Sequence, residues 1–192
     1  SIVLGSLAAY GLAIMKSNWG NRISTFLLFS KLVPTITIMI PLYIILDKVH
    51  LLGTYVGPIL AHVSVNAPFV AWLVLGFIRD IPGDLFEAGK LDGCTRMQVF
   101  WKIVFPLLSP AIGSALLLVM QYSWNELLFS MQYTNLHTYT LTVGVSRFVG
   151  AISVDWGQSS AAATIVMVPI IIAGFFLQKY LVSGLTAGAV KG

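Results

Sequence analysis

Residues 57–78 have the sequence GPILAHVSVNAPFVAWLVLGFI, which contains no Asp, Glu, Lys or Arg. An α-helix rises about 1.5 Å per residue, so about 20 such residues cross the roughly 30 Å hydrocarbon core of a bilayer. Lys31 is the one charge in four further windows of this kind, residues 1–15, 23–46, 106–125 and 159–178. The sequence therefore predicts an all-α, polytopic membrane protein with five transmembrane helices.

The composition of the chain excludes a soluble globular domain. Of its 192 residues, 57% are hydrophobic and 9% are charged, against about 25% charged in ordinary soluble domains. The net charge of +4 comes from scattered residues without a basic run, so we expect no nucleic-acid partner. The single cysteine, Cys94, cannot form an intrachain disulfide. The sequence offers no grouping of polar residues for a metal site, a catalytic site or a cofactor in this chain.

The basic residues are distributed unevenly between the two sides that alternating helices create. Two of them, Lys48 and Arg147, lie on one side, and eight lie on the other: Lys16, Arg22, Arg79, Lys90, Arg96, Lys102, Lys179 and Lys191. The positive-inside rule therefore places three segments in the cytoplasm, residues 16–22, 79–105 and 179–192. The first window is about one turn too short for a span, so we interpret it as a spanning helix whose beginning is missing. The chain then starts on the outer side, and an odd number of helices with that start suggests at least one further helix upstream if the native N-terminus is cytoplasmic. We thus expect six helices in the complete protein and a single membrane domain over residues 1–192.

Residues 79–105 interrupt the windows on the cytoplasmic side, and their local chemistry predicts two short helices. Pro82 is suited to the start of the first helix, where the helix dipole favours acidic residues such as Glu87. The turn sequence formed by Asp92 and Gly93 ends this helix.

The second helix of this segment begins with a capping box, in which Gln98 follows Thr95 by three residues. Its apolar face is predicted at i, i+3, i+4 and i+7, which are Phe100, Ile103, Val104 and Leu107. Pro106 then begins the next span. A unit of this form could dock a partner protein or lie on the lipid surface, and the residues alone favour neither.

The spacing of residues 87–106 resembles the EAA motif of permease subunits in binding-protein-dependent ABC importers. That motif reads Glu-Ala-Ala, three residues, Gly, nine residues, Ile, one residue, Leu and Pro. Every spacing is met here, with two departures, Gly89 for Ala and Phe105 for Leu. The residues that match or accompany the motif are Glu87, Ala88, Gly89, Asp92, Gly93, Ile103 and Pro106.

The resemblance extends along the whole chain and is closest to the carbohydrate-type importers, the group that includes the smaller permease of the maltose transporter. Three stretches resemble that group: Pro41-Leu42-Tyr43, Trp124-Asn125-Glu126 and the tail from Gly184 to Gly192. Such permeases have six spans, which agrees with the topology expected from the windows and the charges.

The resemblance implies a set of roles and partners. Residues 79–105 would be a coupling loop that fits a cleft of a cytoplasmic ATPase, with Glu87 paired to a basic residue of the ATPase. Gly93 would form the corner, Ala88 and Gly89 would allow close packing, and the tail at 183–192 would reach the same interface. The chain itself would not be an enzyme, since ATP and magnesium would bind the ATPase. The implied partners are a second permease, two ATPase copies, an extracytoplasmic substrate-binding protein and membrane lipid.

The implied function is import of a sugar or sugar-like solute across the inner (plasma) membrane by alternating access. One alternative is an importer permease for phosphate, a peptide or a polyamine, because the coupling loop is common to those classes. Another is a secondary transporter, which would work without an ATPase. An intramembrane enzyme would need several ionisable residues within its spans, and this chain has only Lys31 well inside one.

A candidate translocation path lies at the outer end of the fourth window, where an aromatic ring and polar groups offer what a sugar needs. Its members are Gln121, Tyr122, Trp124, Asn125 and Glu126. The alternative is an interfacial tryptophan anchor beside a solvated glutamate. The outward loop 126–158, with Tyr133 and Trp156, could meet a substrate-binding protein or anchor at the surface.

Three further polar residues lie within the windows and have two interpretations each. Lys31 is near enough to the cytoplasmic end to extend its ammonium group to the interface, or it belongs to the pathway. His62 and Asn66 would form hydrogen bonds between helices or contact the solute.

Overall fold

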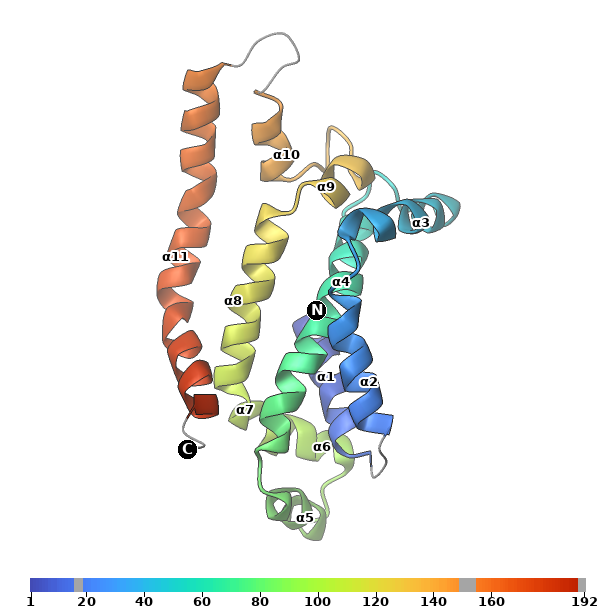
Figure 1. Ribbon diagram of the computed structural model, residues 1–192, viewed down its shortest axis with the longest axis vertical. Coiled ribbons are helices and arrows are strands. Elements are labelled where there is room, and N and C mark those ends of the chain that lie inside the picture. The colour runs from blue at the N-terminus through green and yellow to red at the C-terminus, as the bar shows by residue number, and fades with distance from the viewer. Residues whose placement is uncertain (16–18, 149–154, 190–192) are drawn as a thin grey trace. The chain divides into compact units, whose positions relative to one another are not determined.

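The computed structural model describes residues 1–15, 19–148 and 155–189, with side chains to 178 and at Tyr180. Every regular element in this part of the chain is a helix (Figure 1). The elements are α1 (Ile2–Ala13), α2 (Trp19–Ser30), α3 (Thr35–Lys48), α4 (Val56–Arg79), α5 (Gly83–Leu91), α6 (Arg96–Val99), the π-helical turn η1 (Phe100–Val104), α7 (Phe105–Leu107), α8 (Ser109–Asn125), α9 (Leu128–Tyr133), α10 (Leu141–Ser146) and α11 (Trp156–Ala189).

Within the described residues, two helices are long and apolar enough to cross a membrane, α4 and the segment Trp156–Gln178 of α11. The number rises to four if each of two bent pairs forms one span, α2 with α3 and Arg96–Leu107 with α8. α1 is apolar but shorter. Helices of this length and composition are those expected of a multi-pass membrane protein, and the number of five spans stays a prediction.

The sequence pattern predicted one continuous helix in the window at residues 23–46. In the structure this window is divided between α2 and α3. The break lies at residues 31–34, where α2 ends in tight bonds from the amides of Lys31 and Leu32 to carbonyls three residues back. Pro34 explains the break, because it has no N–H to donate and its ring disfavours helical geometry at the preceding residue. Prolines elsewhere are tolerated within helices, as Pro41 is in α3.

The chain forms two compact units, residues 1–32, 66–117 and 177–192 in the first and residues 33–65 and 118–176 in the second. In the first unit, α1 approaches α4 at Gly5, where an added Cβ would lie 2.6 Å from the Cβ of Val70. Val70 is fully buried there. A glycine on α1 therefore lets the two backbones pack closely, as small residues do between membrane helices.

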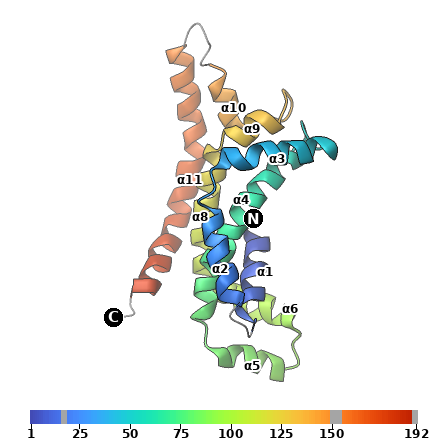
Figure 2. The same cartoon turned by 45° about the vertical axis from the view of Figure 1, so that its right-hand side comes forward.

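The second unit has its own core around Leu46, Ala61, Phe129 and Tyr133. In it, α3 lies beside α9 (Figure 2). The Tyr133 hydroxyl donates to the backbone oxygen of Met39 in α3, with the two oxygens 2.6 Å apart. The suggestion that Tyr133 could meet a substrate-binding protein or anchor at the surface is therefore wrong, because its side chain is fully buried between α9 and α3.

Residues 96–108 depart from the predicted α-helical register. The buried residues of this stretch are Val99, Phe100, Val104 and Leu108, whereas Leu107 is 52% exposed. The reason is the π-helical turn η1, which has more residues per turn than an α-helix and so moves the following side chains around the axis. The prediction that Leu107 lies on the buried face is therefore wrong.

At the other end of the chain, α11 continues to Ala189, so much of the stretch predicted as a tail at 183–192 is helical. Residues 190–192, and the basic residues Lys16 and Lys191 used for the topology, lie outside the described residues.

Candidate functional site

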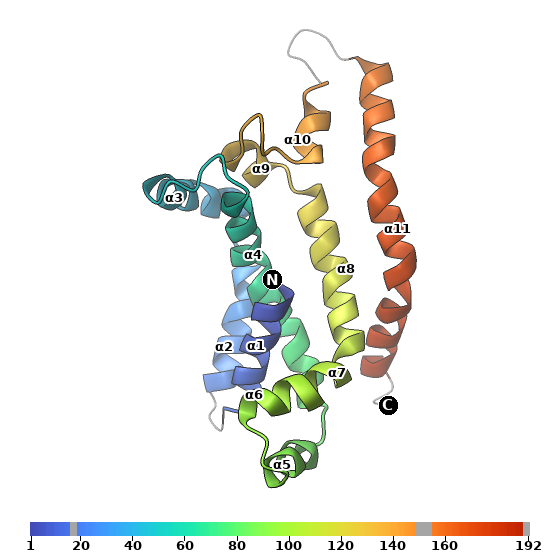
Figure 3. The same cartoon turned by 180° about the vertical axis from the view of Figure 1, so that it is seen from behind.

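The predicted coupling loop forms a helix, a corner and a second helix at one end of the first unit, with α5 beyond α6 (Figure 3). α5 ends in a hydrogen-bonded corner: the amide of Gly93 donates to the carbonyl of Lys90, and the amide of Cys94 to that of Gly89. This pair of bonds is a Schellman motif, and it requires a left-handed residue after the helix. Gly93 has a φ of +77°, so the glycine of the motif is there for its backbone geometry.

The second helix begins with the predicted capping box. The amide of Gln98 donates to the Thr95 hydroxyl, and the amide of Thr95 donates to the Gln98 side chain at 2.8 Å. These reciprocal bonds satisfy two amides that a helix start leaves without partners. Both ends of the 92–95 connection are therefore fixed by local hydrogen bonds.

Gly89 and Ile103 contact each other inside the chain. A Cβ at Gly89 would lie 2.7 Å from Cδ1 of Ile103 and 3.1 Å from Cγ2 of Val99. The sequence suggested that Gly89 lets a partner approach, but its buried position assigns it to the packing of α5 on η1. Ala88, one residue earlier, is exposed.

The exposed side chains of α5 combine charge with apolar area. Glu87 and Ala88 are exposed, and Leu91 is 89% exposed. Asp92, Gly93 and Pro106 are exposed as well, while Ile103 is half-buried. These exposed residues leave a leucine and a carboxylate of α5 available to a partner.

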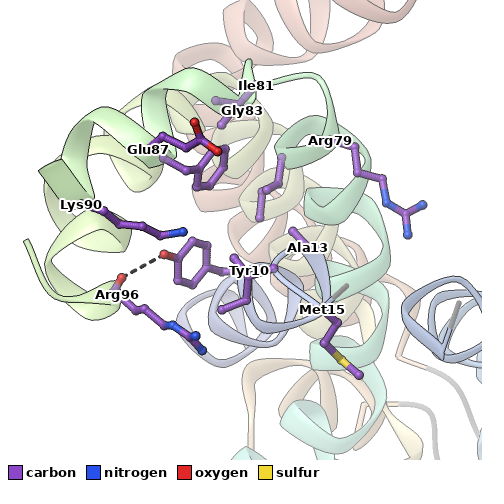
Figure 4. Close-up of a pocket in the computed structure, with 12 residues that line it drawn as sticks. Tyr10, Ala13, Met15, Arg79, Ile81, Gly83, Glu87, Lys90 and Arg96 are labelled. Atoms are coloured by element: carbon purple, nitrogen blue, oxygen red, sulfur yellow. Dashed lines mark hydrogen bonds between the residues drawn. The ribbon is translucent and has the colours of Figure 1, made fainter. Parts of the chain in front are cut away.

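A cavity of about 450 Å³ lies between α5 and the ends of α1 and α4 (Figure 4). Glu87 and Lys90 line it from α5, and Tyr10 lines it from α1. The dashed line in Figure 4 is the bond from the Tyr10 hydroxyl to the Arg96 carbonyl, 2.9 Å long. Arg79, at the end of α4, donates to Asn21 of α2 at 2.6 Å. Tyr10 was not predicted at this site, because one aromatic residue in an apolar window has no distinguishing pattern.

A second cavity, of about 640 Å³, lies in the second unit at the end of α8. Four of the five predicted path residues line it: Gln121, Tyr122, Asn125 and Glu126. Thr35 joins them from α3, with its hydroxyl 3.2 Å from that of Tyr122. Thr35 was not anticipated, because its placement depends on how α3 begins after Pro34. Hydroxyl and amide groups beside leucines suit recognition of an uncharged, hydroxylated solute.

Trp124 does not line this cavity. Its indole Nε1 donates to the carbonyl of Val166 in α11 at 3.1 Å, and its own carbonyl accepts from Thr142. The structure thus places Trp124 at the contact between α8 and α11.

Glu126 is 8% exposed, and its carboxylate forms an internal cap. It accepts from the amides of Phe129 at 2.8 Å and Ser130 at 3.2 Å, at the start of α9. A carboxylate there satisfies free amides and is favoured by the helix dipole. The interpretation of Glu126 as a solvated group at a span end is therefore wrong, and the sequence signal that could have shown it is an acidic residue just before a short helix.

Lys31 has its ammonium group 3.4 Å from Oδ1 of Asn66 and 5.2 Å from the ring centroid of Phe69, both on α4. Asn66 thus forms the interhelical bond that the sequence predicted. His62 lies edge-on to Phe129, with the ring centroids 6.1 Å apart, and its buried Nδ1 has no hydrogen-bond partner within the described part of the chain.

Among the residues that the structure describes, no group of three or more His, Cys, Asp or Glu could hold a metal ion. The sequence from residue 1 to residue 187 matches the profile of the family described as "Binding-protein-dependent transport system inner membrane component". The chain belongs to this family. Its membrane location and the family resemblance inferred from residues 87–106 are thereby confirmed.

Curated relatives cover nearly all of this chain. It is 34% identical over 194 residues to the trehalose/maltose transport system permease protein MalG of Thermococcus litoralis, which covers 100% of this chain and 70% of that protein. It is 33% identical over 193 residues to the melibiose/raffinose/stachyose import permease protein MelC of Bacillus subtilis, with coverages of 100% and 70%. A probable ABC transporter permease of Sinorhizobium fredii is 35% identical over 190 residues, covering 99% of this chain and 68% of that protein.

The fold is similar to one chain in a crystal structure of a bacterial ABC transporter involved in the import of the acidic polysaccharide alginate. The TM-score is 0.66 at 16% sequence identity, and the match covers 93% of this chain and 72% of the other. At this identity the likeness establishes the fold alone.

Proposed function

We propose that this chain is the membrane-spanning permease subunit of an ATP-driven importer for a sugar or a sugar-like solute. Family membership supports the importer, and relatives named for trehalose, maltose, melibiose and raffinose support the sugar. An importer of phosphate, a peptide or a polyamine is less well supported, because none of the relatives named above is described as a transporter of such a solute. A secondary transporter without an ATPase does not fit a family of binding-protein-dependent systems.

The coupling element in this proposal is α5 with its corner, on the cytoplasmic side. The observation that carries it is the combination of three exposed residues on α5, Glu87, Ala88 and Leu91, with a buried residue, Gly89, that packs against η1. A helix packed in this way moves as a rigid body when a partner binds its exposed residues. Because α4 precedes it and α6 and η1 follow it without long linkers, that movement reaches the spans.

The partners in this proposal are those with which ABC importer permeases work in general: a second permease, cytoplasmic ATPase subunits and a substrate-binding protein. ATP and magnesium belong to the ATPase, and this chain contributes no catalytic group. The C-terminal end of α11 lies on the same cytoplasmic side. The extracytoplasmic surface that meets the binding protein includes the loop after α9, where Leu136 is 68% exposed.

The solute path in this proposal includes the cavity at the end of α8. Gln121 and Asn125 are exposed there and offer amide donors and acceptors, and Tyr122 offers a ring. Glu126 acts by holding the wall of the cavity, because its carboxylate is bonded to α9. These groups suit a neutral solute more than an anion such as phosphate.

Uptake in proteoliposomes tests the proposal. The complete protein, co-expressed with its genomic neighbours, is purified with whatever co-purifies, and uptake of radiolabelled trehalose, maltose and raffinose is compared with phosphate, a tripeptide and spermidine. The proposal expects ATP-dependent uptake of at least one sugar, lost in Glu87→Lys. ATP-independent uptake, or uptake of only a non-sugar solute, would contradict it.

A further inference from the structure

Tyr10 lies near the end of α1, far in sequence from the coupling segment, yet contacts both helices of that segment. It is 6% exposed, although it borders the 450 Å³ cavity. Apolar packing alone does not account for a tyrosine at this position, because a leucine would fill the helix interface equally well. The contacts of the hydroxyl and of the flat ring therefore indicate a more specific role.

The hydroxyl of Tyr10 is used in a specific bond. It donates to the backbone oxygen of Arg96, 86 positions later, at 2.9 Å. Arg96 is the first residue of α6, directly after the N-cap residue Thr95, and its carbonyl also accepts the amide of Phe100. The bond therefore attaches α1 to the start of the second helix. Its acceptor is a backbone oxygen, so a change in the rotamer of another side chain does not break it.

The ring of Tyr10 contacts both sides of the corner. It stacks on Phe86 of α5, with centroids 6.4 Å apart and planes 15° apart, and packs against Phe100 with centroids 5.2 Å apart. Phe100 is fully buried at the start of η1. One rigid side chain with two torsions thus connects α5, η1 and α1.

The position of α1 is in turn tied to α4 through Gly5. A Cβ at Gly5 would lie 2.6 Å from Val70 Cβ and 2.9 Å from the carbonyl oxygen of Ala67, so the two helices are in backbone contact. A displacement of α5 therefore has a route to the body of the first unit through Tyr10 that does not follow the chain through α4. The cavity beside Glu87 and Lys90 leaves α5 open space on this side.

We propose that Tyr10 is a positioning residue for transport, which couples the movement of α5 to α1 by its bond to Arg96 and its stacking on Phe86. The inference rests on the proposed function, because it assumes that a partner moves α5. It assigns to α1 a direct part in coupling that residues 79–105 alone do not provide.

Tyr10→Phe tests the bond while keeping the ring. Tyr133→Phe is the matched control, because it also removes a buried hydroxyl that donates to a distant backbone oxygen, but in the second unit. The full complex is purified for each variant. Three quantities are measured: ATPase co-purification, amide hydrogen exchange at residues 83–104, and solute transported per ATP hydrolysed.

Loss of one buried hydrogen bond is expected to speed exchange at residues 83–104 about fivefold in Tyr10→Phe. Transport per ATP falls by a similar factor while the ATPase remains bound. Tyr133→Phe leaves exchange at 83–104 and transport per ATP at wild-type values. Tyr10→Ala, which also removes the stacking, has a larger effect than Tyr10→Phe on both.

Two results overturn the inference while leaving the proposed function intact. One is unchanged exchange at residues 83–104 in Tyr10→Phe. The other is faster exchange with wild-type transport per ATP, which would make Tyr10 a packing residue only. If no ATPase co-purifies even with the wild type, the proposed function fails and the positioning role fails with it.

Discussion

Replacement of Gly93 by alanine isolates the backbone requirement of the corner after α5. The φ of Gly93 is +77°, and a Cβ there would meet no atom within 4 Å, so the variant introduces strain without a clash. A left-handed conformation costs an L-residue about 1–2 kcal/mol. The smaller entropy of the unfolded alanine chain offsets about 0.4–1 kcal/mol of that cost. The net destabilisation is about 1 kcal/mol, which is about fivefold in the local opening equilibrium.

Gly83→Ala is the matched control, because Gly83 begins the same helix, also has open space around it and has no positive φ. Hydrogen exchange measured by mass spectrometry on peptides covering residues 83–99 reports both variants. Gly93→Ala is expected to exchange about fivefold faster than wild type, Gly93→Asn less so, and Gly83→Ala at or below the wild-type rate. If Gly93→Ala and Gly83→Ala behave alike, the corner does not depend on left-handed geometry and the reasoning is wrong.

Three further predictions concern other parts of the two units. Glu126→Gln replaces the carboxylate that accepts hydrogen bonds from two amides of α9, and it should lower the free energy of unfolding by about 1–2 kcal/mol. A thermal shift assay measures this change, and an unchanged melting temperature would contradict the role of Glu126 as a helix cap. Gly5→Val should cost about 1–3 kcal/mol because its Cβ would overlap α4, whereas Gly11→Val, with open space around it, should change the melting temperature little. Burial, followed by the Glu126 carboxylate, raises the pKa of Tyr133 to about 12. The stabilising contribution of the neutral phenol is therefore complete below pH 10 and is lost between pH 10 and 12. Tyr133→Phe should reduce the loss of stability over this pH range, and an identical pH profile of stability in the variant would refute the prediction.

The features that the sequence predicted correctly are those that depend on a few neighbouring residues. Thr95 and Gln98 form their capping box, and Gly93 forms the corner, because each needs only the local backbone. The apolar windows also predicted helical membrane segments, since hydrophobic length is a property of the segment itself.

The features that the sequence missed depend on residues far away in the chain. Gly89 faces Ile103 because α5 folds back on η1, and the motif spacing cannot say which face of α5 is buried. The π-helical turn moved Leu107 to an exposed position, and no simple periodicity signals such a turn.

At the candidate path, the sequence grouped residues of which four line one cavity, but it did not predict their partners. Trp124 is bonded to α11 instead, and Glu126 lines the cavity while it caps α9. Those partners become visible only when α8, α9 and α11 are assembled.

The central claim is that α5 and its corner dock an ATPase, and quantitative co-purification tests it most directly. The complete protein is expressed with its genomic neighbours, purified in detergent, and compared with Glu87→Lys and with the matched charge reversal Asp84→Lys at an exposed acid of the same helix outside the motif. The account predicts that an ATPase subunit co-purifies with the wild type and with Asp84→Lys and falls at least tenfold with Glu87→Lys. Retention of the ATPase by Glu87→Lys, or its absence from the wild type, would contradict the claim.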